Sequence, residues 1–358
     1  MTAPDRDTPD GDRVAADAAN GNEGARDGAP HLRRAGAVLL LGALLATLAV
    51  PIVFGGRAAL DEALAFPLRD WLALLACAFA SSLARSVKLQ WLVRQLGVLP
   101  GFRHTLGITL ATDCAFMATP VGIGGYAASV YYLRGTGIRA SGAAAVTAAD
   151  QALDLVFFAL ALPVAGAFEF GTRLPHEWGL VALGGGAAML VLAAAAWLVH
   201  RRFEAWLADD QARWPRQRAA IRGFLAGLRH NAKVLLRGGP LLFLGTFALT
   251  ALQWLTRYAV LWLALALLGH EVSFALTWLL QAIVLNAAQW AGLPAGGGGA
   301  DIGLGAALAA WVPSTELATA LLLWRVATLY FGLVIGIGAI AWLARRRARS
   351  RAQAESRR

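Results

Sequence analysis

The sequence predicts an all-α, polytopic integral membrane protein with about six full spans and two opposed re-entrant hairpins in an inverted repeat. Composition supports this class, because 58% of the 358 residues are hydrophobic and only 15% are charged, as is typical of membrane domains. Apolar runs long enough to cross a bilayer recur along the chain. Lys and Arg, which give a net charge of +10, gather between these runs, and this favours membrane orientation over nucleic-acid binding.

Eight apolar runs are candidate membrane segments, against about 20 residues needed for one crossing. They cover residues 36–54, 71–93, 105–133, 141–168, 178–200, 240–268, 274–312 and 316–343. The first run is longer than the core of a secretory signal peptide and begins further along the chain, so we expect it to be retained. Together the runs predict a transmembrane domain over 35–345, with halves 35–168 and 178–345.

The two ends of the chain differ from this apolar region. Residues 1–34 are polar and lack periodicity, so we expect a disordered cytoplasmic tail. Residues 346–358 are rich in Arg and predict a basic cytoplasmic tail.

Basic residues predict which ends of the runs face the cytoplasm. They flank the runs at Arg33, Arg34, Arg94, Arg103, Arg134, Arg139, the 201–238 connection and Arg345–Arg351. The opposite side receives Arg57, Arg69 and Arg173. We therefore expect both termini on the cytoplasmic side of the inner membrane.

This sidedness requires two of the runs to turn back within the membrane. The run 105–133 has basic residues at both ends, so it enters and leaves from the cytoplasm and turns at Thr119–Gly125. The 240–268 span ends outside and the 316–343 span ends inside. The run 274–312 between them therefore enters and leaves from outside and turns at Leu293–Asp301. Each element of the second half is then inverted relative to the first, which predicts an inverted-topology repeat.

A weak internal similarity accompanies this repeat. Arg85, Leu89, Leu96 and Gly97 have the same spacing as Arg257, Leu261, Leu268 and Gly269. In Leu-rich helices, chance also accounts for four such identities.

The 201–238 connection contains a candidate interfacial helix. Its apolar face carries Ile221, Phe224, Leu225, Leu228 and Leu235, beside Arg218, Arg222, Arg229 and Lys233. Such a helix lies on an anionic leaflet. The alternative is a solvated basic linker that follows the positive-inside rule.

The glycine-rich breaks Thr119–Gly125 and Leu293–Asp301 are candidate binding sites. Each second arm begins at a break, so two half-helix N-termini with free amides would point toward the bilayer midplane and attract an anion such as a lipid phosphate. Glycines would let the ligand approach the backbone. The alternative is that these glycines only allow tight helix packing.

Ionisable residues inside the runs are functional candidates, because charge at membrane depth is costly. They are Arg85, Lys88, Asp113, Asp150, Asp154, Arg257, Asp301 and Arg325. Arg85 and Lys88 lie near a span end, and we expect them to snorkel to the interface.

The other members of this set have more than one interpretation. We expect Asp154 to contact a substrate or to pair with Arg257 or Arg325, and Asp113 to be a partner of Lys88. For Asp301 the first interpretation is an N-cap of the second half-helix. The alternative role of Asp301 is contact with a coupling ion or substrate.

No soluble catalytic or metal-binding pattern accompanies these residues, and we expect no cofactor. The six His residues are scattered without metal-ligand spacing. Cys77 and Cys114 lie in apolar runs, where thiols behave as small hydrophobes. Asp209 and Asp210 are adjacent carboxylates outside the runs, and a solvated loop is the favoured interpretation.

Two motifs resemble the transmembrane domain of bacterial lysylphosphatidylglycerol synthases and flippases and its stand-alone relatives, over roughly residues 35–345. The first comprises the break at Thr119, then Tyr131-Tyr132-Leu133-Arg134, Gly137 and Asp150-Gln151-Ala152-Leu153-Asp154. It is similar to the family's Pro-Gly-Gly-Glu stretch, aromatic-Leu-Leu-Arg-Arg-x-Gly step and Glu-Arg-x-x-Asp helix. The second, Pro294 to Asp301 followed by Arg325, is similar to Pro-Gly-Gly-x-Gly-x-x-Glu and a late helical Arg.

The chain departs from these family motifs at the acidic positions. Gly125 or Tyr126 stands where the family has Glu, Asp150-Gln151 replaces Glu-Arg, and Asp301 replaces the second Glu. We expect the chain to lack the aminoacyl-transferring domain that the full synthases attach after this region, and we therefore expect no lysyl transfer.

The function that the resemblance implies is transport of an anionic phospholipid or polyprenyl-phosphate-linked lipid, with a phospholipid head group as ligand. The candidate substrate-binding residues are Pro120, Gly122, Gly124, Gly125, Tyr126, Asp150, Asp154, Arg257, Pro294, Gly296, Gly297, Gly298, Gly299, Asp301 and Arg325. A membrane-embedded lipid-modifying transferase and a scaffold for envelope-lipid enzymes are the alternatives. Either a homo-oligomer or a complex with such enzymes is compatible with the sequence.

Overall fold

The computed structural model describes residues 38, 40–171, 201–202 and 215–356. These residues form helices joined by short turns, with no strand among them. The helices are Leu40–Ala65, α2 (Leu68–Arg94), α3 (Phe102–Ala118), η1 (Pro120–Gly122), α4 (Ile123–Arg134), α5 (Ala140–Phe170), α7 (Pro215–Leu236), α8 (Gly239–Leu267), α9 (Phe274–Trp290), η3 (Pro294–Gly296), α10 (Gly299–Leu308), α11 (Ser314–Arg325), the π-helix η4 (Val326–Tyr330) and α12 (Phe331–Glu355).

Five helical segments are long and apolar enough to cross a membrane. They are Leu40–Ala65, Leu68–Arg94, Ala140–Phe170, Gly239–Leu267 and Ser314–Arg349. Five of the six predicted full spans thus have a matching helix, and the sixth, 178–200, lies outside the described residues. The prediction of an all-α, polytopic membrane protein is confirmed.

The ends of the chain add little to this comparison. The predicted tail 1–34 lies outside the described residues. The basic segment after residue 345 is a continuation of α12, which remains helical to Glu355.

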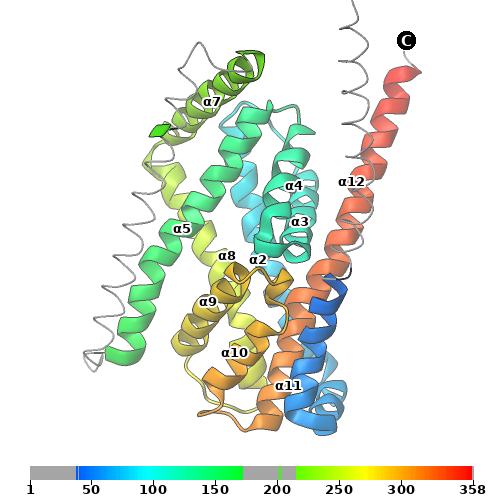
Figure 1. Ribbon diagram of the computed structural model, residues 1–358, viewed down its shortest axis with the longest axis vertical. Helices are drawn as coiled ribbons and strands as arrows, with labels where there is room; N and C mark the ends of the chain where they lie inside the picture. The colour runs from blue at the N-terminus through cyan, green and yellow to red at the C-terminus, as the bar shows by residue number, and fades with distance from the viewer. Residues whose placement is uncertain (1–37, 39, 172–200, 203–214, 357–358) are drawn as a thin grey trace, which may run out of the picture.

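The two interrupted runs form helical hairpins that point toward each other from opposite ends of the bundle (Figure 1). The α3–α4 hairpin has arms of 17 and 12 residues, and the α9–α10 hairpin has arms of 17 and 10 residues. Each arm is shorter than the roughly 20 residues of a full crossing. The turns η1 and η3 contact each other, so the hairpin tips meet inside the bundle.

The two turns have the same backbone conformation. Val121 has φ 55° and ψ 8°, and Ala295 has φ 53° and ψ 18°. These are the only non-glycine residues with positive φ among those that the structure describes. Each is followed by a left-handed glycine, Gly122 at φ 71° and Gly296 at φ 75°. Such a conformation is costly for a side chain with a Cβ, so its occurrence at matched positions supports a common origin of the two hairpins.

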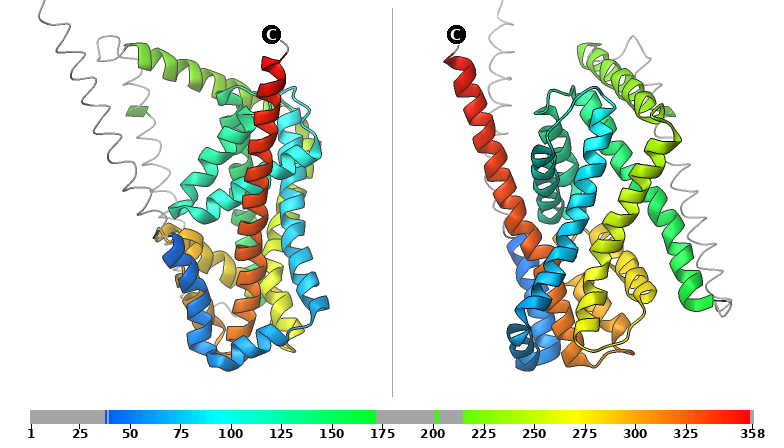
Figure 2. Two further views of the ribbon diagram at one scale, coloured as in Figure 1. Left: turned by 90° about the vertical axis from the view of Figure 1, so that its right-hand side faces the viewer. Right: turned by 180° about the vertical axis from the view of Figure 1, so that it is seen from behind.

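The long helices place the basic segments at one end of the bundle. Figures 1 and 2 show that α2 and α12 end there and that α3, α5 and α8 begin there. The helix α7, which was predicted as a candidate interfacial helix, lies across the same end. It packs against α5, and its Phe224 stays 40% exposed.

Small residues allow close approach between helices. A Cβ added at Gly336 of α12 would lie 2.5 Å from the Cβ of Cys114 in α3, and one at Gly332 would lie 3.2 Å from Met117. This is the packing mode that membrane helices use, since lipid gives no hydrophobic drive to associate. Gly332 and Gly336 therefore serve close packing of α12 against α3.

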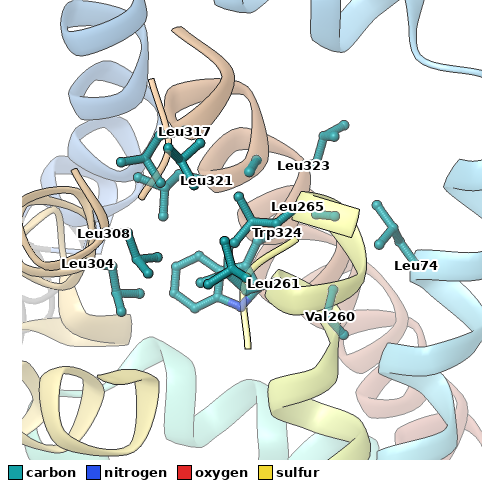
Figure 3. Packing of buried hydrophobic residues seen from close by; sticks show 14 of the residues in the cluster. Leu74, Val260, Leu261, Leu265, Leu304, Leu308, Leu317, Leu321, Leu323 and Trp324 are labelled. Atoms are coloured by element: carbon teal, nitrogen blue, oxygen red, sulfur yellow. The ribbon is translucent and has the colours of Figure 1, made fainter. Parts of the chain in front are cut away.

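The largest apolar cluster fixes the second hairpin against the long helices. Leu261 and Leu265 of α8, Leu304 of α10 and Leu321 of α11 surround Trp324 (Figure 3). Each of these side chains is at most 2% exposed. This packing holds the next residue of α11, Arg325, against the turn of the hairpin.

Candidate functional site

Arg325 joins three elements at the second hairpin. Its Nε and Nη2 donate to the two carboxylate oxygens of Asp301 at 2.6 and 2.7 Å, and its Nη1 donates to the carbonyl of Ala295 at 3.0 Å. The guanidinium also lies 4.4 Å from the Trp324 ring. Both charged side chains are almost fully buried, at 3% and 0% exposure. The pair therefore ties α11 to the first turn of α10 and to the strained residue of η3.

The N-cap interpretation of Asp301 is wrong in its simple form. Gly298 occupies the N-cap position without a side-chain hydrogen bond, and Asp301 lies in the first turn of α10. A carboxylate there interacts favourably with the helix dipole, and its bidentate partner is Arg325. Since this negative charge already occupies the helix N-terminus, a second anion is disfavoured at that point.

The glycines of the second break lie against the first helix. A Cβ at Gly297 would lie 3.0 Å from that of Ala43, and one at Gly298 would lie 3.1 Å from that of Ala46. These distances favour the packing alternative at these two positions. Whether they also contact a substrate stays a prediction.

The first break is closed by its own side chains. The amide of Gly124 donates to Thr119 Oγ1 at 2.9 Å, so one amide that was expected to be free is capped. A Cβ added at Gly125 would overlap the ring of Phe116. Tyr126 packs edge-on against the same ring at 4.9 Å, and its hydroxyl donates to Gln151 at 3.3 Å.

Five ionisable side chains from α2, α3 and α5 form a buried cluster, here called the charge cluster: Arg85, Lys88, Asp113, Asp150 and Asp154. Arg85 donates to Asp150 Oδ2 at 2.9 Å and also to Asp113. Lys88 Nζ lies 2.7 Å from Asp150 Oδ1 and 3.0 Å from Asp154 Oδ1. No side chain of the cluster is more than 11% exposed.

These contacts correct three predictions. Lys88 is 0% exposed and pairs inside the bundle, so neither it nor Arg85 snorkels. The partner of Asp154 is Lys88, not Arg257 or Arg325. The partner of Asp113 is Arg85, not Lys88.

A spacing signal in the sequence would have found the cluster. Arg85 and Lys88 are three residues apart, and Asp150 and Asp154 are four apart. On helices these spacings place each pair on one face. Since an unpaired charge at membrane depth is costly, two such faces are expected to meet.

Arg257 of α8 differs from these paired residues. In the part of the chain that the structure describes, its guanidinium carbon lies 6.0 Å from the centroid of the Trp254 ring. It lines a cavity between α2, α3, α8 and the η4–α12 segment, together with Ser81, Ser82 and Asp113.

Comparison with known proteins adds the family. Residues 34–336 match the family described as the lysylphosphatidylglycerol synthase TM region. The chain belongs to this family. A UPF0104 membrane protein of Archaeoglobus fulgidus is 22% identical over 263 residues, which are 70% of this chain and 79% of that protein.

The geometry accounts for the departures of this chain from the lysylphosphatidylglycerol synthase motifs. In the second motif, Asp301 in place of Glu still reaches the late helical Arg325 with both oxygens. In the first motif, Gly125 and Tyr126 bring no carboxylate, and Phe116 fills the space beside them. In the same half, the carboxylates of Asp150 and Asp154 bind the cations of α2.

Among the residues that the structure describes, no group of three or more His, Cys, Asp and Glu side chains has an arrangement that would hold a metal ion. Asp209 and Asp210, the adjacent carboxylates considered for a transferase, lie outside the described residues.

Proposed function

We propose that this member of the lysylphosphatidylglycerol synthase TM family is a lipid transporter of the inner membrane. It moves an anionic phospholipid or a polyprenyl-phosphate-linked lipid between leaflets by alternating access around the two hairpins. The observation that carries the proposal is the pair of opposed hairpins, whose matching Pro-x-Gly turns meet inside the bundle. Interrupted helices that meet in this way are how transporters build a site near the bilayer midplane.

Membrane physics supports a re-entrant position for the hairpins. A break in a helix leaves backbone amides and carbonyls without partners, which lipid cannot satisfy, so breaks occur where protein or a cavity surrounds them. In both turns the glycine amide donates back across the turn, from Gly122 to Thr119 and from Gly296 to Leu293, each at 3.1 Å. Both of these glycines, Gly122 and Gly296, are buried, as this rule requires.

The orientation follows from the basic residues. The end of the bundle that carries α7 and the C-terminal end of α12 faces the cytoplasm in our proposal, because Lys and Arg concentrate on the cytoplasmic side. Both termini then lie inside the cell.

Cysteine accessibility will test hairpins and orientation together. In a Cys77→Ser, Cys114→Ala background, cysteines at Gly101 and Gly135, before and after the first hairpin, should react only from the cytoplasmic side. Cysteines at Glu271 and Ser314, before and after the second hairpin, should react only from outside. Glu271, Ser314, Gly101 and Gly135 are all exposed. Labelling of one pair from opposite sides would mean that the hairpin between them is an ordinary span.

Transport itself is tested with purified protein in liposomes that contain head-group-labelled lipids. We expect labelled phosphatidylglycerol to exchange between leaflets faster in liposomes with the protein than in protein-free liposomes. The protein should accelerate the exchange of zwitterionic phosphatidylcholine less. Equal rates with and without folded protein, for both phospholipids and for a polyprenyl-phosphate lipid, would reject transport and favour the scaffold alternative.

A further inference from the structure

Helix α9 exposes two side-chain amides at the depth of the hairpin tips. Asn286 and Gln289 are both exposed, and they are three residues apart, so they share one face of the helix. A Cβ added at Gly122, in the turn of the first hairpin, would lie 2.8 Å from Gln289 Nε2. Since the two hairpin tips meet inside the bundle, this proximity places the amides near the middle of the membrane.

Two polar side chains from the first half of the chain lie beside the same turn. Tyr126 of α4 follows Gly122 by one helical turn and is 41% exposed, and its hydroxyl donates to Gln151 Oε1 of α5 at 3.3 Å. Helix α9 packs against both α5 and η1, and Figure 1 shows it beside α5 and below the first hairpin. We call Tyr126, Gln151, Asn286 and Gln289 the polar face.

Hydrocarbon does not suit this polar face. A side-chain amide has two donors and an acceptor, and an amide without partners in hydrocarbon is costly. Asn286 uses one donor within α9, to the carbonyl of Ala282 at 2.6 Å. No hydrogen bond joins the side chain of Gln289 to another residue in the described part of the chain. Exposed amides at this depth therefore require polar surroundings, either water or part of a ligand.

The polar face is uncharged, and the charged side chains next to it on α5 are already paired. Asp150 and Asp154 lie before and after Gln151 in the sequence, and their carboxylates bind Arg85 and Lys88. The polar face thus offers amides and a phenol, which both donate and accept hydrogen bonds. A hydroxyl group also donates and accepts through a single atom, so it matches this surface better than a charged group does.

Exposed apolar side chains border the polar face. They are Ile123 at the start of α4, and Ile283 and Trp290 of α9. In a bilayer these side chains suit acyl chains, whereas the amides beside them suit a head group. A lipid with a hydroxylated head group therefore fits the whole surface better than a soluble polyol does.

We propose that the polar face binds the hydroxyl groups of a lipid head group near the middle of the membrane, while the acyl chains stay against the apolar border. Two classes of lipid carry such hydroxyls: a phospholipid with a glycerol head group, and a polyprenyl-phosphate-linked lipid with a sugar. The proposal rests on the proposed transport function and deepens it, since it names the part of the head group that is recognised. Binding makes and breaks no covalent bond.

Thiol labelling tests whether the polar face meets polar surroundings. The full chain, in the Cys77→Ser, Cys114→Ala background and in phosphatidylcholine nanodiscs, receives one cysteine and a water-soluble methanethiosulfonate. Because the thiolate is the reactive form and apolar surroundings suppress it, Asn286→Cys and Gln289→Cys should react at least about tenfold faster than Val334→Cys. Val334 is the control, since it is 69% exposed within the apolar span Ser314–Arg349. Equal rates at all three positions would place the polar face in lipid and overturn the proposal.

A second copy of the chain is the competing occupant of this face. Contact between copies would give slow labelling at Asn286→Cys and Gln289→Cys and disulfide-linked dimers of Asn286→Cys under mild oxidation. That result would also overturn the proposal.

Short-chain lipids then test recognition of hydroxyls at the Asn286→Cys reporter, which keeps the other three residues of the polar face. Dihexanoyl-phosphatidylglycerol and dihexanoyl-phosphatidylmethanol have the same charged phosphodiester, but only the first has head-group hydroxyls. We expect phosphatidylglycerol to slow labelling at least about fivefold more than phosphatidylmethanol, the ratio that one neutral hydrogen bond gives. Hexyl glucoside offers a sugar without phosphate, and the stronger protector of the two hydroxylated probes identifies glycerol or sugar as the source. Protection that is absent with both, or equal with phosphatidylmethanol, would overturn hydroxyl recognition.

Variants in the reporter background assign the contacts. Gln151→Leu and Gln289→Leu should each reduce protection by the hydroxylated probe about fivefold and leave phosphatidylmethanol unaffected. Tyr126→Phe removes only a hydroxyl, so it gives the same test if a Leu variant fails to fold. Gln353→Leu is the matched control, because Gln353 is exposed on α12 beyond the apolar span. Unchanged protection in all three polar-face variants would reject the assignment.

These outcomes are separate from those of the transport assay. Labelling and protection report binding, so they stand even if liposomes show no lipid movement. Lipid movement without protection at Asn286→Cys would reject this site and leave the proposed function intact.

Discussion

Neutralising either Asp301 or Arg325 alone will destabilise the protein by about 3–5 kcal/mol, because each change leaves one buried charge without its partner. The two side chains are 0% and 3% exposed and share two hydrogen bonds. Asp301→Asn and Arg325→Gln should therefore both reduce the yield of folded protein and lower its unfolding temperature in detergent. A role of Asp301 in capping alone would make Asp301→Asn mild, since Asn caps as well as Asp.

The double variant separates charge pairing from other roles. Asp301→Asn/Arg325→Gln should be more stable than either single variant, because no charge remains unpaired. It should stay below the wild type by about 1 kcal/mol, the value of one lost hydrogen bond, since Arg325 also donates to Ala295. Arg69→Gln is the control, because that side chain is 88% exposed in its pair with Asp70 and exposed pairs contribute little. Losses that simply add in the double variant would show that the two residues act independently.

Much of the fold is predictable from the sequence because the bilayer limits the choices. Five predicted spans have matching helices, and both hairpins turn at the predicted Pro-Gly breaks. Span length and the sidedness of Lys and Arg are properties of single segments, so they need no knowledge of tertiary packing.

The sequence predicts less well which charged side chains form ion pairs with one another. The depth of Asp154 along its span predicts a contact with Arg257 or Arg325. The rotation of each helix about its axis, however, decides which helix faces meet. In the structure α2 turns Arg85 and Lys88 toward α5, while Arg257 at the matching position of α8 turns toward a cavity. Sequence periodicity indicates which residues share one face of a helix, whereas the helix that this face contacts depends on tertiary packing.

The roles of the break glycines were also open, because a glycine is required both where a ligand approaches and where another side chain packs. At Gly125 the side chain of Phe116 favours the packing role. This residue lies nine positions earlier on the opposite arm of the hairpin, and its ring occupies the space where a Cβ would stand. A sequence pattern does not reveal this contact, because Phe116 resembles any other apolar residue of α3.

Adding a single methyl group at Gly125 should therefore destabilise the first hairpin, and shortening Phe116 should relieve the effect. Gly125→Ala is expected to cost about 1–3 kcal/mol, the usual penalty for overpacking, because the new Cβ would overlap the Phe116 ring. Gly166→Ala is the matched control, since Gly166 lies inside α5 with open space around it, and this change should be neutral or stabilise by about 0.5–1 kcal/mol.

The cycle with Phe116→Ala decides between packing and ligand approach at this glycine. Phe116→Ala alone should be destabilising, because it removes the ring that Tyr126 packs against and that lies 5.4 Å from the guanidinium carbon of Arg85. In the Phe116→Ala background, however, Gly125→Ala should cost almost nothing, which gives a coupling of at least about 1 kcal/mol in unfolding measurements. If Gly125→Ala instead keeps the wild-type unfolding temperature and abolishes lipid movement in liposomes, the space beside Gly125 belongs to the substrate, because only a ligand would then meet the added methyl group.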